Sequence, residues 1–364
     1  MESITFKYIN KSFKINDLCF SNKQELQKKA QSFLEEKQLY LQKIGEFLLH
    51  WLDDNDTIEL ATSGTTGVPK KIRIKKQFMV NSSLLTGEFL QLKEKDTALL
   101  ALPADFIAGK MMLVRAMVLG LSLDTVIPSS IPLVNINKNY DFIALTPMQA
   151  LYSLSELHLV KKIILGGAPI TAELEEKLQK IPTQIYATYG MTETVSHIAM
   201  RKISQQTTKP IYTAMPYVYF EKDERNCLII NCEKVSEEQI ITNDYVHLFS
   251  ETQFEWKGRY DNIINSGGVK IFPEKVEFHL SKIIKSPFFI WYEKDDILGQ
   301  KVILFVEGKE EQNVNLLQKI REEKELNKYE IPKKIYYLEK FSYTLSGKIQ
   351  RNESVKILLN AEKC

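Results

Sequence analysis

One short segment of the sequence has the residue types that hold a polyphosphate. It reads Thr62-Ser63-Gly64-Thr65-Thr66-Gly67-Val68-Pro69-Lys70 and follows the strand-like run 58–61. Glycines let backbone N–H groups approach phosphate oxygens, Ser and Thr hydroxyls add hydrogen bonds, and the lysine adds positive charge. A solvated turn is the alternative, but a turn does not need a threonine pair followed by G-x-P-K. The spacing is not that of a Walker A loop, which disfavours a P-loop NTPase.

Three other short motifs combine glycine with a reactive or charged side chain. They are Tyr189-Gly190-Met191-Thr192-Glu193, Gly258-Arg259-Tyr260-Asp261 and Ser346-Gly347-Lys348. Taken alone, Glu193, Arg259 and Lys348 are each more often solvated surface charges. Their meaning therefore depends on the elements that position them.

Composition excludes several classes of protein. Forty-eight basic residues nearly cancel 46 acidic ones, and a net charge of +2 gives no electrostatic basis for binding nucleic acid or a membrane surface. The first residues contain no apolar run of signal-peptide length, and charges interrupt the apolar stretches. Four cysteines are too few for a disulfide scaffold. We therefore expect a cytoplasmic protein without a membrane span, whose partners are small molecules.

The first two thirds of the chain alternate strand and helix patterns. Apolar residues between Asn22 and Trp51 have the spacing of one amphipathic helix. Short β-branched or apolar runs predict strands at 57–61, 125–127, 141–145, 161–165 and 184–187, and Thr171 caps a predicted helix over 172–181. This alternation predicts βαβ units and a largely parallel sheet.

Beyond Leu228 the pattern changes to closely spaced strands at 227–232, 240–249 and 253–257, which predict a meander or small barrel. A strand pair at 288–292 and 302–306, a helix over 314–326, a strand at 334–338 and a helix over 353–359 then predict a second α+β unit. We expect an α/β protein with domains at 1–258 and 259–364.

The four motifs, in this order, resemble those of the acyl-adenylate-forming superfamily, which includes acyl-CoA synthetases, luciferases and peptide-synthetase adenylation domains. The resemblance covers about Ile58 to Arg351. It implies an AMP-binding N-terminal domain and a smaller, mobile lid domain that carries the catalytic lysine. It also implies ATP, Mg²⁺ and CoA as ligands.

Residue roles follow from the resemblance position by position. The phosphates of ATP would be held by Ser63, Gly64, Thr65, Thr66, Gly67 and Lys70. The adenine and acyl pockets would be lined by Gly166, Gly167, Ala168 and Pro169, with Tyr189 stacked on adenine beside Gly190 and Met191. Thr192 would contact the α-phosphate, Glu193 would bind Mg²⁺, and Asp244 and Arg259 would hold the ribose.

One residue departs from the family at the ribose motif. The chain has Thr242-Asn243-Asp244 where relatives usually have Thr-Gly-Asp. Asn tolerates a left-handed backbone better than most residues, so we expect a turn to persist there.

The lid is implied by three further positions. Asp261 resembles the hinge, and its place at the predicted domain junction agrees with that role. Gly267 and Gly268 resemble the segment that lines the pantetheine tunnel, although a plain hairpin turn is compatible. Lys348 resembles the mobile lysine that stabilises negative charge during adenylation.

Within the superfamily, residues 189–197 and 258–277 are most similar to ligases that join 2-succinylbenzoate to CoA in menaquinone biosynthesis. Relatives usually carry a Pro-x-x-His-x-x-Gly stretch, but the segment beginning at Pro103 and ending at Gly109 lacks the His. We expect Lys110 and Arg115, on one helix, to meet the second carboxylate of such an aromatic acid, with Ser196 and His197 facing the acyl group. Surface charges and core packing are the plain alternatives for these four residues.

Two other functions remain open at this point. One is a ligase of the same superfamily for another aryl or fatty acid. The other is a nucleotide-binding protein without catalysis, which the presence of Glu193, Asp244, Arg259 and Lys348 disfavours.

Overall fold

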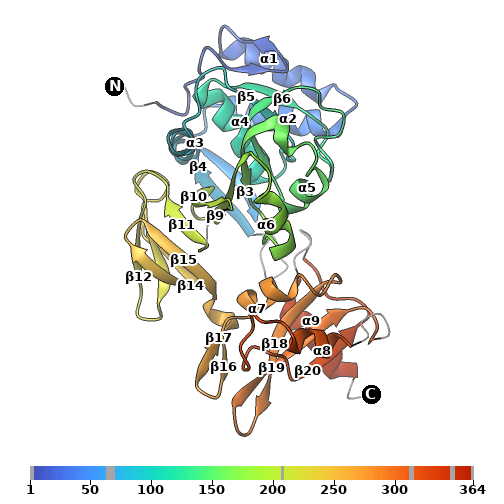
Figure 1. Ribbon diagram of the computed structural model, residues 1–364. Coiled ribbons are helices and arrows are strands. Elements are labelled where there is room, and N and C mark those ends of the chain that lie inside the picture. Colours follow the sequence, from blue (N-terminus) through green and yellow to red (C-terminus); the bar gives the residue numbers. More distant parts are fainter. Residues whose placement is uncertain (1–3, 63–69, 206–208, 311–314, 345–348, 362–364) are drawn as a thin grey trace.

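The fold has a large part and a smaller part joined by a short connection (Figure 1). The computed structural model describes residues 4–62, 70–205, 209–310, 315–344 and 349–361. Strands β1–β15 belong to the large part and β16–β20 to the small part. This is the mixed α/β fold that the alternating pattern predicts.

One half of the main sheet is parallel and lies between helices. The sheet has thirteen strands in the order β12-β13-β14-β15-β11-β10-β9-β8-β7-β5-β6-β1-β2. Its parallel strands are β1 (Lys14–Ile15), β6 (Ser122–Thr125), β5 (Thr97–Leu100), β7 (Tyr140–Leu145), β8 (Val160–Leu165) and β9 (Gln184–Gly190), and β2 (Leu18–Cys19) closes the edge antiparallel to β1. The strands predicted at 141–145, 161–165 and 184–187 are confirmed. The strand predicted at 125–127 instead covers 122–125, where it pairs with β5.

The other half of the sheet is antiparallel and forms the predicted meander. Its strands are β10 (His197–Ile203), β11 (Ile211–Ala214), β12 (Tyr219–Lys222), β13 (Cys227–Asn231), β14 (Ile240–Ser250) and β15 (Gln253–Arg259). Because β10 pairs with β9, the meander continues directly from the parallel half. Strand β9 therefore lies at the junction of the two halves, with parallel β8 on one side and antiparallel β10 on the other.

The prediction of one long helix near the N-terminus is wrong. Two helices, α1 (Lys23–Leu34) and α2 (Leu39–Leu52), are separated by residues 35–38 and fold back on one another. They pack so closely that a Cβ on Gly45 would lie 2.5 Å from the carbonyl oxygen of Ala30. Four residues are about one helical turn, so the break leaves the apolar periodicity in phase and invisible in the sequence.

The remaining helices of the large part cover the parallel strands. They are α3 (Lys76–Leu90), α4 (Ile107–Leu119), α5 (Pro147–Tyr152) and α6 (Ala172–Leu178), with a 3₁₀ turn, η1, at Leu157–Leu159. Helix α6 starts as predicted, with the Thr171 hydroxyl accepting from the N–H of Leu174, but ends three residues before Ile181. None of the helices in the described ranges is both long and apolar enough to cross a bilayer.

The strand predicted just before the phosphate-type segment exists but does not join the main sheet. Strand β3 (Thr57–Thr62) pairs antiparallel with β4 (Lys70–Lys75) as a separate two-stranded ribbon. The ribbon extends toward the region between the two parts (Figure 1). Residues 63–69, which connect its strands, lie outside the described residues.

The small part is built around its own sheet. A 3₁₀ turn, η2 (Tyr260–Asn262), follows β15 and leads into β16 (Ile264–Ser266), β17 (Val269–Ile271), β18 (Phe288–Asp295), β19 (Gly299–Glu307) and β20 (Lys334–Leu338), with helices α7 (Pro273–Leu280), α8 (Leu316–Arg321) and α9 (Arg351–Ala361). The predicted strand pair is confirmed as β18–β19, and the strand at 334–338 and the helix at 353–359 are confirmed as β20 and part of α9. Helix α8 ends five residues earlier than expected, because the chain turns to bury Leu326 in the core of the small part.

A buried lysine joins α2 to α3 behind the ribbon. The side chain of Lys76 is inaccessible to solvent, and its Nζ donates to Asp53 Oδ1 at 2.7 Å and to the carbonyl oxygen of Trp51 at 3.1 Å. A buried ammonium is tolerated only where such partners replace water. Lys76 therefore fixes the end of α2, and with it the start of β3.

We expect Lys76→Met to lower the free energy of unfolding by about 2–4 kcal/mol, because the Trp51 carbonyl and the Asp53 carboxylate lose their shared donor. Urea unfolding followed by circular dichroism measures this loss. The matched control is Lys75→Met. The exposed Lys75 side chain pairs with exposed Glu237 and lies over the Phe78 ring, and its replacement should change stability by less than about 1 kcal/mol. Equal stability of the two variants would contradict the structural role that we assign to Lys76.

Candidate active site

The glycine segment and the Tyr-Gly motif lie at one edge of the sheet. Strands β8 and β9 are parallel neighbours, so the segment that starts at Gly166 and the motif at 189–193 leave from the same edge. The Thr188 hydroxyl donates to the carbonyl oxygen of Leu165 at 2.9 Å, and a Cβ on Gly166 would lie 2.6 Å from that hydroxyl oxygen. Open α/β sheets bind ligands at this edge.

The next two residues of the glycine segment and Pro169 stay accessible there. Gly167, Ala168 and Pro169 are exposed, and Gly167 has a φ of +85° with open space where a Cβ would be. Glycine is needed at this position for the backbone conformation and leaves room for a planar ligand.

A tight turn after β9 sets the direction of the acidic residue. The Thr194 hydroxyl oxygen accepts from the N–H of Met191 at 2.9 Å, and its single proton faces the backbone oxygens of Met191 at 2.9 Å and Ser196 at 2.7 Å. A Cβ on Gly190 would overlap the carbonyl oxygen of Ser196, so the two ends of the turn can close only on glycine. This turn holds Glu193 at the surface.

Tyr189 and Asp244 are brought together from β9 and β14. The Tyr189 hydroxyl donates to Asp244 Oδ2 at 2.6 Å, while Trp256 Nε1 donates to Asp244 Oδ1 at 3.0 Å. Burial and the neighbouring Asp244 carboxylate raise the pKa of Tyr189 well above its ordinary value. Arg259 NH1 lies 3.7 Å from Asp244 Oδ1. The predicted adenine and ribose residues thus form one connected group.

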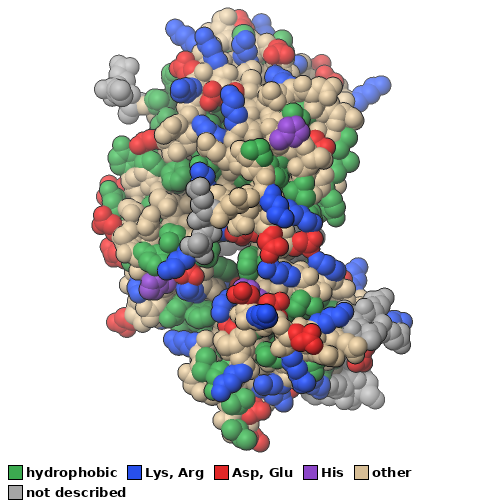
Figure 2. Space-filling model, in the orientation of Figure 1, with side chains coloured by type: hydrophobic (Ala, Val, Ile, Leu, Met, Phe, Trp, Pro, Cys, Tyr) green, Lys and Arg blue, Asp and Glu red, His purple; other side chains and the backbone are tan. Residues whose placement is uncertain are grey.

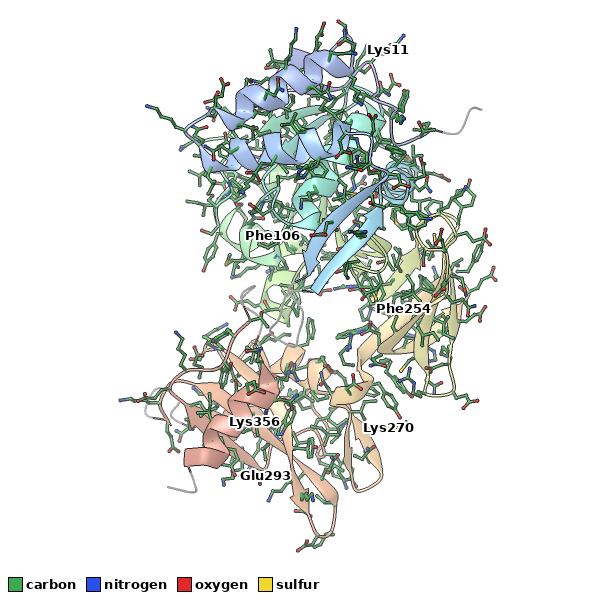
Figure 3. All side chains as sticks on the ribbon, turned by 180° about the vertical axis from the view of Figure 1, so that it is seen from behind. Lys11, Phe106, Phe254, Lys270, Glu293 and Lys356 are labelled. Carbon is green, nitrogen blue, oxygen red and sulfur yellow. The ribbon has the colours of Figure 1, made fainter. Side chains whose placement is uncertain are left out.

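Aromatic side chains support the ring of Tyr189 from behind. Phe254 and Tyr212 meet it edge-on with ring centroids 5.1 Å and 5.8 Å away. Figure 3 shows Phe254 within the meander that supplies this packing. Edge-on packing fixes the plane of the ring, which prepares a surface for a planar ligand.

The turn expected at Asn243 is absent. Asn243 lies inside strand β14, and it is not among the residues with positive φ. The strand pairs with β15 through Asp244 and Arg259, which holds the backbone extended. The left-handed conformation invoked for the Thr-Asn-Asp sequence is therefore wrong for this chain.

Arg115, Ser196 and His197 form a buried polar cluster together with Thr86 of α3. Arg115 is 2% exposed; its NH2 donates to Ser196 Oγ at 2.8 Å and its Nε to Thr86 Oγ1 at 3.4 Å. His197 Nε2 lies 3.0 Å from Thr86 Oγ1. Within the described part of the chain, no carboxylate forms an ion pair with Arg115.

Burial determines the charges in this cluster. It lowers the pKa of Arg115 to about 9, which leaves the guanidinium protonated near neutral pH. Burial, with help from Arg115, also holds the pKa of His197 well below its ordinary value. The cluster is therefore a neutral imidazole and two hydroxyls around one uncompensated positive charge.

Lys110 belongs to a different site from Arg115. Five residues along a helix turn the side chain by about 140°, so the two lie on different faces of α4. Lys110 lines a cavity of about 610 Å³ together with Lys43, Glu46, Asp105 and Arg73. Burial lowers the pKa of Lys110, and Asp105 and Glu46 oppose that change. The structure thus does not bring the two predicted carboxylate partners together.

The residues expected to serve the hinge and CoA are found in the connection and the first hairpin of the small part. Asp261 lies in η2, between the last strand of the large sheet and the first of the small one. Gly267 and Gly268 form the tip of the β16–β17 hairpin, which points away from the large part (Figure 1). Lys270 on this hairpin lies far from Phe106, the residue at the position of the missing His (Figure 3).

Some expected residues lie outside the described ones. They are Ser63, Gly64, Thr65, Thr66, Gly67 and Lys348, and for Lys70 only the backbone, at the start of β4, is described. The described residues contain no group of three or more acidic, His or Cys side chains able to hold a metal. Mg²⁺ needs only one or two carboxylates beside substrate phosphates, so the exposed Glu193 carboxylate fits the magnesium expectation.

Sequence reasoning missed Thr86, Trp256 and Tyr212. Thr86 lies in mid-helix, 111 residues from His197, so nothing local points to it. Trp256 carried one signal that could have been used: it lies three residues before Arg259 in a predicted strand, near the motif that ends at Asp261.

Comparison with known proteins places this arrangement in a family. The family described as AMP-binding enzyme matches residues 18–221, more than half of the chain. The chain belongs to the AMP-binding enzyme family. This membership confirms the resemblance to the acyl-adenylate-forming superfamily, and the match includes the Tyr189 motif and the Arg115 cluster.

Individual relatives of this AMP-binding enzyme agree. A 2-succinylbenzoate–CoA ligase of Listeria monocytogenes is 26% identical over 352 residues, covering 85% of this chain and 72% of the relative. An acyl-CoA synthetase (AMP-forming)/AMP-acid ligase II-like protein of Dyadobacter fermentans is 33% identical with a TM-score of 0.61, covering 90% of this chain and 97% of that structure. An O-succinylbenzoate CoA synthetase of Bacillus subtilis, solved with ATP and magnesium, has the same fold at 22% identity, with a TM-score of 0.70 over 82% of this chain and 69% of that structure.

Substitution of two glycines by alanine should lower the free energy of unfolding by different amounts. Gly190→Ala forces a Cβ into the backbone at Ser196, and we expect a loss of about 2–4 kcal/mol in unfolding free energy. Gly167→Ala adds only the strain of a positive φ in open space, and we expect about 1 kcal/mol. Thermal unfolding of the two variants side by side measures the difference, and an equal loss would show that the turn after β9 is not the constraint we describe.

Proposed function

We propose that this protein is an ATP-dependent acid–CoA ligase that activates 2-succinylbenzoate through an acyl-adenylate and transfers it to CoA. The family membership and the names of the relatives support an adenylate-forming CoA ligase. The choice of acid rests on one observation. Arg115 is a buried cation without a described carboxylate partner, and it lies with Ser196 and His197 just beyond the turn that carries Glu193.

The first half-reaction joins the acid to AMP. An oxygen of the substrate carboxylate attacks the α-phosphorus of ATP, a new P–O bond forms, and pyrophosphate leaves with the electron pair of the broken bond. Tyr189 and Gly167 would hold the adenine, Asp244 and Arg259 the ribose, and Thr192 the α-phosphate. The segment 63–70 and Lys348 would meet the remaining negative charge.

Mg²⁺, bound through Glu193 and the phosphates, would supply positive charge that offsets the charge of the phosphate oxygens. The tight turn fixed by Thr194 and Gly190 holds the Glu193 backbone in place. Because the carboxylate is already exposed there, it needs little reorganisation to reach its ligand.

The second half-reaction transfers the acyl group to sulfur. The CoA thiolate attacks the acyl carbon, a C–S bond forms, the C–O bond to AMP breaks, and AMP leaves with the electron pair. The hairpin with Gly267 and Gly268 points away from the large part in the present arrangement. We propose that the small part, residues 259–364, rotates about Asp261 to bring this hairpin to the acyl-adenylate.

The Arg115 cluster suits an acid with two carboxylates. A buried uncompensated guanidinium is unfavourable, and a carboxylate that reaches it forms a charge-assisted hydrogen bond in a site of low dielectric. The reactive carboxylate of 2-succinylbenzoate would be placed at the ATP site and the other at Arg115. Neutral His197 would leave that attraction unopposed and add a hydrogen-bonding group.

The alternative function is a ligase for a different aryl or acyl acid. One observation favours it: Phe106, which is 57% exposed, stands at the position of the His in the Pro-x-x-His-x-x-Gly stretch that relatives usually carry. An apolar ring there would favour an apolar acid.

Removal of the predicted lysine should separate the two half-reactions. We expect Lys348→Ala to lower the rate of adenylate formation by about 10²–10³-fold, since it removes one preorganised cation from the transition state. Transfer from preformed acyl-adenylate to CoA should stay within about threefold of wild type. Pyrophosphate exchange measures the first step and single-turnover thioester formation the second. Equal loss of both steps would refute the scheme of two arrangements.

Discrimination between acids should depend on Arg115. We expect pyrophosphate release to favour 2-succinylbenzoate over its monoester at the succinyl carboxylate by about 10–200-fold, and Arg115→Met to abolish most of this preference. The variant should not lower the midpoint of thermal unfolding, because it removes a buried unpaired charge. If the wild-type protein releases pyrophosphate equally well with the acid and the monoester, the alternative ligase for another acid is favoured. If it adenylates no acid, both proposed functions are excluded.

A further inference from the structure

A network of polar side chains connects the meander to the predicted hinge. Arg225 lies between β12 and β13 and donates to Asp223 Oδ2 at 2.8 Å and to Asn243 Oδ1 at 2.9 Å. Its second terminal nitrogen reaches the carbonyl oxygen of Thr242 at 3.3 Å, and the guanidinium lies 5.3 Å from the centre of the Tyr260 ring. Arg225 thus contacts β14 and the connecting turn η2 at the same time.

Arg225 determines which way the Asn243 amide faces. A guanidinium can only donate, so the side-chain oxygen of Asn243 must face Arg225. The amide nitrogen must then face the other way, where it donates to Asp261 Oδ2 at 3.0 Å. Asn243 consequently presents a fixed donor to the residue proposed as the hinge.

This contact depends on the residue type at position 243. A glycine there would have no side chain to reach Asp261, and the strand conformation of Asn243 does not itself require glycine. Arg259 NH2 lies 3.9 Å from the same oxygen of Asp261. The Asp261 side chain is otherwise exposed, so these contacts are the ones that a change in its backbone dihedrals would break.

We propose that Arg225 and Asn243 form a clamp that holds Asp261 in the present arrangement and must open before the small part rotates toward acyl transfer. The inference rests on the proposed function, in which two arrangements serve two half-reactions. Arg225 and Asn243 act here as positioning residues, since they affect the reaction only through Asp261.

A second set of contacts between the parts lies away from the hinge. Lys282 pairs with Glu176 at 2.7 Å, Lys285 pairs with Glu173, and the Ser281 hydroxyl accepts from the N–H of Ala172. Figure 2 shows basic and acidic side chains facing one another across this narrow junction between α6 and residues 281–285, here called the waist. Exposed ion pairs of this kind weaken in high salt. A test at high ionic strength therefore weakens these ion pairs relative to the hydrogen bonds of the clamp and of Ser281.

The distance between the two parts tests the clamp directly. Nitroxide labels on exposed Cys19 and on Ile297→Cys, a turn position that is 91% exposed, report the separation of the parts. Cys364→Ser removes the other thiol, and Cys227 and Cys232 are buried. Pulsed electron–electron double resonance on the full chain at 0.5 M salt gives the distribution of distances between the two nitroxides.

We expect the labelled parent protein to have one dominant distance between the nitroxides. Asn243→Ala and Arg225→Met should each raise the fraction of molecules at other distances about two- to fivefold. Asn231→Ala, on neighbouring strand β13 and away from the hinge, is the matched control and should resemble the parent. A distribution unchanged by both clamp variants would overturn the proposal.

Single-turnover transfer of preformed acyl-adenylate to CoA tests the role of opening. We expect Asn243→Ala to raise this rate about two- to fivefold. The KM for ATP, measured separately by pyrophosphate exchange, should stay unchanged. A rate equal to or below wild type would contradict a clamp that must open first. If no acid is adenylated, the proposed function fails, while the label distances still decide whether the clamp exists.

Discussion

The tight turn after β9 is the constraint on which the site depends. Thr194 closes the turn through its hydroxyl, which contacts the backbone at Met191 and at Ser196, and Gly190 permits the close approach of the backbone at Ser196. On one side of the turn, Tyr189 is directed to Asp244; on the other, Ser196 accepts from Arg115 and His197 faces Thr86, which Arg115 also contacts. A single backbone feature thereby links the residues proposed to bind the nucleotide, here called the nucleotide half, to those proposed to bind the acid, here called the acyl half.

Electrostatics differ sharply between these halves. At the nucleotide half, Asp244 is buried but has Tyr189 and Trp256 as donors and Arg259 nearby. At the acyl half, Arg115 has only hydroxyl partners among the described residues, and its charge is not balanced. A carboxylate that is already satisfied can orient a sugar hydroxyl, whereas an unbalanced cation favours an anion. This contrast is the physical basis for expecting a dicarboxylic acid.

Among the described residues, polar contacts of modest strength hold the small part near the connection and at helix α6, and the ring of Tyr245 also packs against that of Phe272. Near the connection, Asn243 reaches Asp261; at the waist, Lys282 and Lys285 face acidic residues of α6. Such exposed contacts suit the rotation proposed for the small part, since larger apolar interfaces would be costly to open. The glycine-tipped hairpin that points away from the large part is consistent with a unit seen in one of its arrangements.

The sequence alone determined the fold class, the positions of many strands and the family, because alternating apolar patterns and glycine-rich motifs are local properties of the chain. It could not reveal the break between α1 and α2, since a four-residue break keeps the helical phase, nor that β3 leaves the main sheet to pair with β4. From the sequence, Lys110 was also grouped with Arg115, although a five-residue spacing along a helix places them on different faces, as the structure shows.

Only the tertiary structure decided what surrounds each charge. Thr86 meets His197 across 111 residues, and Arg225 meets Asn243 from a neighbouring turn, through contacts with no local signature. Burial that depends on several elements at once makes His197 neutral and leaves Arg115 charged. Residue types and spacing are written in the chain, but desolvation and hydrogen-bond partners arise only when distant segments pack together.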